Sequence, residues 1–166
     1  TSTTELNTRL FQYITTNNEN MVNFNGLHFQ DTENTVIQFD GPHSQLNVEN
    51  TVFDKIGHHT EMTSNMCNES QITSILSATT LTYSNVHVTN SSSHLDISST
   101  KNALVQDVTC QDHHGSYCVM VDTQQVRQNI HLLHNTFENM HQHAVSVVDS
   151  FNVTVHGNRF ENVNGI

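Results

Sequence analysis

The sequence predicts an all-β solenoid, a coil of parallel strands, and the main observation is a stretch written twice near its end. NIHLLHNTFENM (129–140) and NVTVHGNRFENV (152–163) correspond at seven positions, all with one offset of 23 residues. Self-similarity at a fixed period in the twenties is typical of repeat architectures. Within each copy, apolar and polar residues alternate, which indicates strands rather than helices. A strand repeated every two dozen residues predicts a coil of strands.

The composition is compatible with this fold. At 166 residues the chain is long enough for one domain with a core, but its hydrophobic share of 34% is low for a compact globule. Only 13% of the residues are charged, so Asn, Ser, Thr, Gln and His make up the balance. A solenoid tolerates this composition because each coil buries only a narrow inward row.

Charge and hydropathy exclude two classes of partner. The formal net charge is −11 with five basic residues, whereas phosphate-backbone binding needs clustered Lys and Arg, so we expect no nucleic-acid partner. No apolar run approaches the length of a membrane span, so we expect no membrane insertion. The chain begins at Thr1 without Met or a leader, which we interpret as a processed or excised mature segment.

Residues 1–16 do not match the repeat. Ser2-Thr3-Thr4-Glu5 has the pattern of a capping box, and Leu6, Leu10, Phe11 and Ile14 lie close to one helical face. This predicts a short amphipathic helix in an N-terminal cap (1–20) that covers the first coil of a solenoid over 21–166. An irregular first strand is the alternative.

A first type of strand recurs from residue 21 onward. In each copy an alternating apolar pair leads to a further apolar residue: Val22 and Phe24 to Phe29, Leu46 and Val48 to Phe53, Leu81 and Tyr83 to Val88, Leu104 and Val105 to Cys110. An Asn or Asp follows each pair, at Asn25, Asn50, Asn85, Asp107, Asn135 and Asn158. All but one of the intervals fit a single coil, which predicts six to seven coils. The long interval indicates a loop insertion at 57–73.

A second type of strand lies between the copies of the first. It comprises TVIQFDG (35–41), YCVMVDT (117–123) and AVSVVDS (144–150), with HLDISST (94–100) as a weaker copy. Aligned on Val36, Cys118 and Val145, these place Asp40, Asp122 and Asp149 at one point of the circuit. Each coil therefore has at least two strands and two bends.

With these residues in place, the sequence resembles the right-handed parallel β-helix proteins of the pectin-lyase-like superfamily, whose generic repeat is similar to NVTVHGNRFENVNGI (152–166). The resemblance covers about residues 20–166. It implies that Asn residues at a sharp bend form a hydrogen-bonded ladder, which we expect for Asn50, Asn135 and Asn158. Asn suits this role because it tolerates left-handed backbone and its amide bonds the coils above and below.

The resemblance also implies polysaccharide cleavage by catalytic carboxylates. Hydrolases of the superfamily use clustered Asp residues, and none of their motifs is intact in this chain. The nearest constellation is Asp122 and Asp149 with Lys101 and Arg127. Paired carboxylates there could act as acid and base, or hold calcium. The alternative is that each Asp caps a turn.

Thirteen histidines are present, and several follow the core Phe or Cys of successive copies: His58, His59, His113, His114, His141 and His143. Imidazoles along one edge could bind zinc or copper, with His113, His114, His141 and His143 as the candidate ligands, or respond to pH. No string with fixed metal-site spacing is present, and solvated polar loops are the alternative.

Cysteines and glycosylation motifs bear on the compartment. A disulfide between Cys110 and Cys118 and two buried thiols are equally compatible with the sequence, and Cys67 makes the number odd. Three glycosylation motifs begin at Asn68, Asn90 and Asn152. All three acceptors are expected in loops or facing outward, as in a secreted glycoprotein.

These observations favour an extracellular, non-enzymatic structural protein. We expect a β-solenoid subunit or segment of a filament, appendage or surface adhesin, which associates end to end because a coil of strands exposes edges at its ends. The alternative is a polysaccharide-binding or polysaccharide-cleaving protein that uses a long face of the rod.

Overall fold

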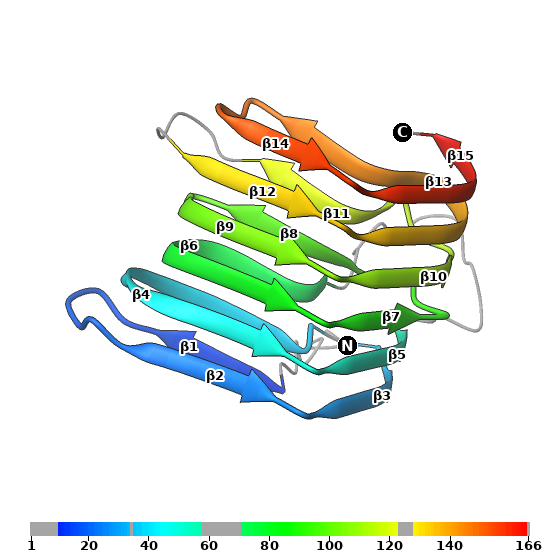
Figure 1. Ribbon diagram of the computed structural model, residues 1–166. Coiled ribbons are helices and arrows are strands. Elements are labelled where there is room, and N and C mark those ends of the chain that lie inside the picture. Colours follow the sequence, from blue (N-terminus) through cyan, green and yellow to red (C-terminus); the bar gives the residue numbers. More distant parts are fainter. Residues whose placement is uncertain (1–9, 34, 58–70, 123–127, 166) are drawn as a thin grey trace, which may run out of the picture.

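The computed structural model describes residues 10–33, 35–57, 71–122 and 128–165, and these form a parallel β-solenoid of six coils without a helix (Figure 1). Every strand pair is parallel, and each joins one coil to the next. The prediction of an all-β solenoid with about six coils is confirmed.

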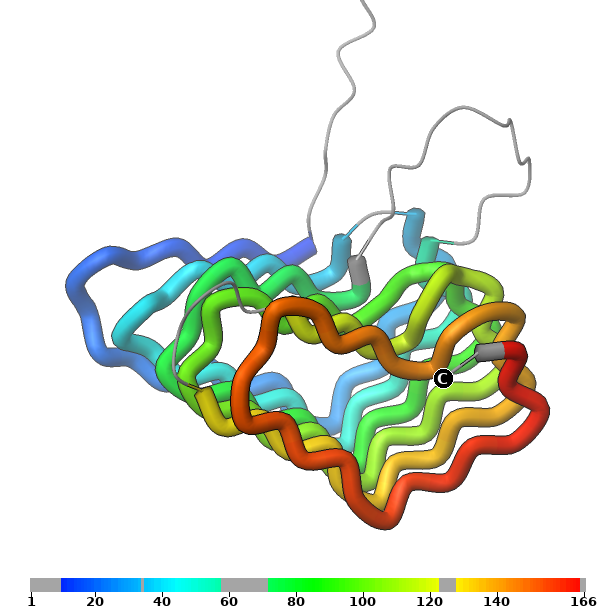
Figure 2. The backbone as a smooth tube through the Cα atoms, turned by 90° about the horizontal axis from the view of Figure 1, so that it is seen from above, coloured from blue at the N-terminus to red at the C-terminus, as the bar shows by residue number. Residues whose placement is uncertain are grey.

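Each coil has three faces, where the sequence predicts at least two strands per coil, and Figure 2 shows the backbone of the stacked coils along the axis. Face A comprises β1 (Phe11–Ile14), the start of β4 (Ile37–Glu49), the start of β6 (Gln71–Ser84), β8 (His94–Ser98), β11 (Tyr117–Asp122) and the end of β13 (Thr136–Val148). Face B comprises β2 (Met21–Asn25), the ends of β4 and β6, β9 (Thr100–Gln106), β12 (Asn129–Leu133) and β14 (Val153–His156). Face C comprises β3 (His28–Thr32), β5 (Val52–Ile56), β7 (His87–Thr89), β10 (Thr109–His113), the start of β13 and β15 (Arg159–Gly165). The strands of coils 1 to 6 span residues 11–32, 37–56, 71–89, 94–113, 117–140 and 143–165, and the corner after face C is counted with the coil that it follows.

Inward-facing side chains of successive coils stack in rows. On face C one row contains Phe29, Phe53, Val88, Cys110, Phe137 and Phe160. The rings of Phe29 and Phe53 stack with centroids 5.2 Å apart, and those of Phe137 and Phe160 also lie 5.2 Å apart. On face B the register pairs Ala103 with Leu81, so Ala103 and not Leu104 occupies the inward row. The sequence favours Leu104 for this row because it is the more hydrophobic of the two side chains.

The corner between faces B and C has left-handed backbone in every coil. Residues there have φ between 50° and 69°: Gly26, Asn50, Asn85, Asp107, His134 and Gly157. Gly, Asn and Asp adopt this conformation most readily, which accounts for most of the column. The series of Asn and Asp residues that the sequence suggested therefore mixes three positions, since Asn25 precedes the corner by one residue and Asn135 and Asn158 follow it by one.

Two Asn ladders result instead of one. On the outside, Asn50 Nδ2 donates to Asn25 Oδ1 (3.1 Å) and Asn85 Nδ2 to Asn50 Oδ1 (2.8 Å). On the inside, Asn135 and Asn158 each accept a backbone N–H of the preceding coil through Oδ1. Asn50 thus belongs to a different ladder from Asn135 and Asn158. Asn satisfies both positions, so residue type alone does not separate them.

Three further expectations need correction. Phe11–Ile14 form strand β1, which pairs with β4, so this part of the expected helix is a strand and the solenoid begins before residue 21. Residues 1–9 and 58–70 lie outside the described residues, but 71–73 belong to β6 and not to the insertion. The second strand type is shifted by one residue in coil 6, because Val145 pairs with Val119 and not with Cys118. That strand has apolar residues on both of its faces, at Ala144 and Val148 as well as at Val145 and Val147, so its sequence pattern permits such a shift.

Candidate functional site

The carboxylates proposed for catalysis or calcium lie at the corner between faces A and B. Asp122 ends β11 and pairs with Val148, so Asp149 lies one position further on, in a turn with a φ of 43°. Lys101 follows the same corner in coil 4, and Arg127 lies outside the described residues. The two carboxylates therefore occupy non-equivalent positions in successive coils. The sequence instead predicts that they are aligned.

The histidine sector divides into residues with different surroundings. His113 is fully buried and hydrogen-bonded through both ring nitrogens, whereas His114 and His141 are exposed with ring centroids 4.6 Å apart. His143 is exposed and pairs in register with Tyr117. Among the residues that the structure describes, no group of three or more His, Cys, Asp or Glu could hold a metal ion. His58 and His59 lie outside those residues.

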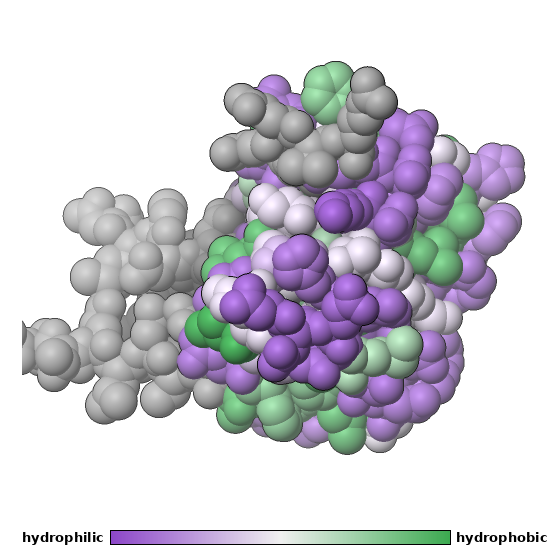
Figure 3. Space-filling view, turned by 90° about the vertical axis from the view of Figure 1, so that its left-hand side faces the viewer, coloured by the Kyte–Doolittle hydropathy of each residue, from purple (hydrophilic) through white to green (hydrophobic). Residues whose placement is uncertain are grey.

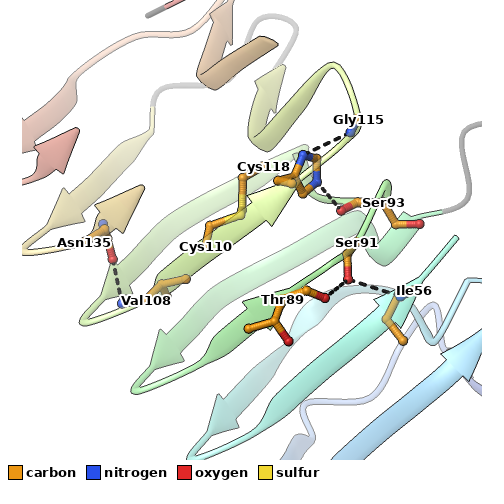
Figure 4. The surroundings of a disulfide bond; sticks show 10 residues. Ile56, Thr89, Ser91, Ser93, Val108, Cys110, Gly115, Cys118 and Asn135 are labelled. Carbon is orange, nitrogen blue, oxygen red and sulfur yellow. Dashed lines mark hydrogen bonds between the residues drawn. A yellow bond between two sulfur atoms is a disulfide. The ribbon is translucent and has the colours of Figure 1, made fainter. Parts of the chain in front are cut away.

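A disulfide joins Cys110 to Cys118, inside the solenoid (Figure 4). Both residues are fully buried, and their Cα atoms are 6.6 Å apart. Cys110 belongs to the inward Phe row of face C, and Cys118 begins the buried part of β11 on face A. The bridge therefore closes the chain around the corner between faces C and A, where His113 and Gly115 lie.

We expect replacement of both bridge cysteines by Ala to lower the free energy of unfolding by about 2–3 kcal/mol, because the reduced chain gains the entropy of a short open loop. Urea denaturation followed by circular dichroism measures this loss. Reduction of the disulfide in the wild type should lower the urea midpoint of unfolding to that of the double variant. An unchanged midpoint in both would contradict a stabilising bridge.

Two of the three glycosylation motifs lie on described, exposed positions. Asn90 follows β7 in a second left-handed column on face C, and its Nδ2 lies 3.3 Å from Asp54 Oδ1. Asn152 precedes β14, and its amide donates to Asn129 Oδ1. Asn68 lies outside the described residues. A glycan attached to Nδ2 of Asn90 or Asn152 would replace the hydrogen bond that this side-chain amide makes to the neighbouring coil.

A groove of about 500 Å³ follows the corner between faces A and B across coils 1 to 4. The corner is six residues long in coil 1 (15–20) but only Ser99 separates β8 from β9, so the surface recedes toward coil 4. Buried Ser44 fixes the longer corner, since its Oγ donates to Asn18 O (2.8 Å) and accepts from Asn20 N (3.3 Å). The groove is polar, and its lining includes Glu19, Met21, His43, Gln45, Thr79 and Lys101.

The two ends of the rod present the inward rows to solvent. In coil 1, Phe11 is 44% exposed and Leu27 37%, although Ile37, the neighbour of Phe11 in the row, is 1% exposed. In coil 6, Val147 is 44% exposed, although its neighbour Val121 is fully buried. Figure 3 shows hydrophobic side chains along the edge formed by coil 1, below a mostly hydrophilic middle. Among the described residues, all the exposed large hydrophobic side chains except Leu76 lie in or beside coil 1 or coil 6.

One outward row shows the same contrast between ends and middle. On face A, Ile14 of coil 1 is 58% exposed and pairs with Asp40, and Val148 of coil 6 is 42% exposed and pairs with Asp122. Between these ends, Asp40 pairs with Ser77, and Ser98 pairs with Asp122. The exception is Leu76, which precedes Ser77 in coil 3 and is 44% exposed. Both end faces are thus apolar at their rims as well as at their centres.

No protein-family model, curated protein or solved structure matches this sequence. No helix among the described residues is long and apolar enough to cross a membrane. The function must therefore be inferred from the surfaces themselves.

Proposed function

We propose that this protein is a non-enzymatic structural β-solenoid of the extracellular space, which stacks end to end on further copies of itself in a filament, appendage or surface adhesin. The observation that carries the proposal is the exposure of the inward apolar rows in coils 1 and 6. The disulfide supports an oxidising compartment, where such bonds persist.

The rows of the two end faces match when coil 1 of one copy is stacked on coil 6 of another. Phe29 would lie over Phe160, which would join the two stacked Phe pairs in one column. In the same register, Val22 would lie over Val153, and Ile14 over Val148. The contact would thus extend the parallel strand pairing by one more coil, with apolar side chains meeting at the centre and at the rim.

One polar position is unmatched in this register. Leu27 shares the row of Asn158, so it would offer no amide oxygen to the backbone N–H that this ladder otherwise satisfies. An unpaired N–H that is buried costs about 1–3 kcal/mol. Full burial of a Val or Phe side chain contributes about 1.5–3 kcal/mol, and several such side chains would be covered, so the apolar contribution outweighs this cost.

A contact between two different end faces is heterologous. Such contacts generate open filaments when the rotation between copies does not close a ring. Six coils at the usual strand separation give an axial repeat of about 30 Å per copy. Filaments of stacked copies would therefore show this repeat along their axis.

Sedimentation analysis across a concentration series tests the proposal. We expect the wild type to exceed its monomer mass of 18.7 kDa as its concentration rises. Phe160→Asp should remain monomeric, because a carboxylate at the centre of the end face cannot be buried without a partner. Thr154→Asp is the matched control, since Thr154 is exposed on the outward face of β14, and it should assemble like the wild type. A wild type that stays monomeric throughout would contradict the proposal.

The groove between faces A and B favours polysaccharide binding as a second candidate function. Its amide, hydroxyl and charged side chains can hydrogen-bond a hydroxyl-rich chain, and the fixed corner around Ser44 preforms one wall. Titration calorimetry with a panel of acidic and neutral oligosaccharides tests this. Lys101→Ala should weaken binding of the acidic members at least several-fold, whereas Lys55→Ala on face C should not. Absence of binding across the panel would exclude this candidate.

A further inference from the structure

The corner that follows β10 contains a buried polar side chain, His113, in one of the inward-facing rows of the solenoid. His113 is fully buried, and its neighbours in the row are Ser91 of coil 3 and Met140 of coil 5. Its Nε2 lies 2.8 Å from Ser93 O, and Gly115 N donates to its Nδ1 at 3.2 Å. In Figure 4, the dashed lines that end at Ser93 and Gly115 mark these two hydrogen bonds, near Cys118 of the disulfide.

These two hydrogen bonds fix one protonation state. Ser93 O is an acceptor only, so Nε2 carries the hydrogen, and Gly115 N–H is a donor only, so Nδ1 carries the lone pair. A proton added to Nδ1 would face the hydrogen of Gly115 N–H. The protonated ring is therefore incompatible with the closed corner, and either the ring or the backbone at Gly115 must move.

The titratable groups around His113 do not offset an added charge. His94, 4% exposed at the start of β8, and His114, next in the chain, both face it and disfavour its protonation. Tyr117 packs edge-on against His94, with ring centroids 4.7 Å apart. Ser91 and Met140, below and above in the row, are uncharged. Burial, with these imidazoles, lowers the pKa of His113 from 6.5 to about 4 in spite of its bonds to Ser93 and Gly115.

The surrounding chain limits how far the corner can open. Cys110 and Cys118 are joined on either side of it, so movement is confined to the residues between them. Gly115 packs so closely on coil 3 that a Cβ atom would lie 2.1 Å from Ser92 O. In addition, His114 N donates to Ser91 O at 2.9 Å. Opening the corner would break these contacts and leave the strands on both sides in place.

We propose that residues 113–117 form an acid-operated latch, in which protonation of His113 releases the corner from coil 3 while the disulfide keeps its two ends together. The inference goes beyond end-to-end assembly, because the latch lies on the side of coils 4 and 5 and not on an end face. It makes the corner between faces C and A a surface that changes with pH.

The direction of the effect follows from linkage. In the open corner His113 titrates near 6.5, and in the closed corner near 4, so the open form binds more protons between these values. The closed form is therefore fully favoured above pH 6.5 and loses stability as the pH falls from there to about 4. The ratio of open to closed corners should rise about 30-fold between pH 7.5 and pH 5.

Amide hydrogen exchange measures this ratio directly. After correction for the intrinsic pH dependence of exchange, the opening constants of the Gly115 and His114 amides should rise about 30-fold from pH 7.5 to pH 5. The Val52 amide, which donates to Leu27 O on the far corner of coils 1 and 2, should change less than threefold and serves as the reference. A rise of less than threefold at Gly115, or an equal rise at Val52, would overturn the proposal.

Two variants and one titration assign the effect to His113. His113→Gln keeps one donor and one acceptor but does not titrate, so the rise at Gly115 should disappear; persistence of the rise would contradict the latch. His114→Gln changes the exposed neighbour and should retain the rise. If His113→Gln does not fold, the NMR titration of His113 in the wild type decides: a midpoint near 4 supports the latch, and one near 6.5 excludes it.

Discussion

Replacement of Phe137 by Ala is expected to lower the free energy of unfolding by about 3–5 kcal/mol, the usual cost of emptying a large buried site. Phe137 is fully buried in the inward row of face C, between Cys110 and Phe160. Neighbouring coils are held apart by their own backbone hydrogen bonds, so they cannot collapse into the cavity. Urea denaturation of a dilute sample, followed by circular dichroism, measures the loss.

Phe160→Ala is the matched control for this prediction. Phe160 belongs to the same row and stacks on Phe137, but it lies in coil 6 and is only partly buried in the single copy. Its loss should cost clearly less than that of Phe137 at concentrations where the protein is monomeric. Equal costs for the two variants would mean that coil 6 is covered even in the monomer.

The second large effect is expected for Asn135→Ala, at about 2–4 kcal/mol. Asn135 is 1% exposed; its Oδ1 accepts from Val108 N (2.9 Å) and its Nδ2 donates to Val105 O (3.0 Å). Alanine would leave that N–H and that carbonyl buried without partners, each at a cost of about 1–3 kcal/mol. The same denaturation experiment checks this value.

Asn129→Ala is the matched control for this prediction, because Asn129 bonds to a neighbouring coil on the exposed surface and not in the inner ladder. Asn129 also bonds between coils, through Nδ2 to Asn102 Oδ1 (3.2 Å), but it is exposed on face B. Water replaces an exposed amide bond, so its removal should change stability by less than about 0.5 kcal/mol. If the two Asn variants were equally destabilised, the inner ladder would have no special structural role.

The coil of parallel strands was predictable because its signal is local and repeated. The offset of 23 residues between Asn135 and Asn158 is the number of residues in that coil, as the pairing of Phe137 with Phe160 shows. The alternating apolar residues of face B also lie inward as expected, from Val22 and Phe24 onward, with the exception of Leu104. Repetition averages out the uncertainty of any single strand.

The sequence predicts at least two strands per coil but does not separate face C from the first strand type, whose copies run on to Phe29, Phe53 and Cys110. β7 has only three residues, and the other strands of face C contain a left-handed residue, such as Lys55 or Asn139, which interrupts the alternation. The sequence predicts a helix over β1 because Leu10, Phe11 and Ile14 fit a helical face as well as they fit a strand of an end coil. Pairing with β4, a tertiary contact, decides between the two.

The surfaces were harder to predict than the fold. The sequence analysis places His113 and His114 together in one sector of the surface. Consecutive residues at the end of a strand face opposite ways, however, and His113 lies in a row with Met140. That row was the signal that could have identified a buried imidazole. Asp122 and Asp149 differ by one position because the strand before Asp149 has apolar residues on both faces, so the hydrophobic pattern that normally sets the register is ambiguous there.

Cross-linking between copies tests end-to-end stacking most directly. Ile14→Cys and Val148→Cys lie at opposite ends of one copy, in the same outward row of face A, and stacked copies would bring them to about the 5 Å spacing of neighbouring strands, within disulfide range. Under mild oxidation, the double variant should give a ladder of covalent multimers that reductant dissolves, whereas each single variant should not. If the double variant forms no larger species than the single ones, copies of this chain do not stack in this register.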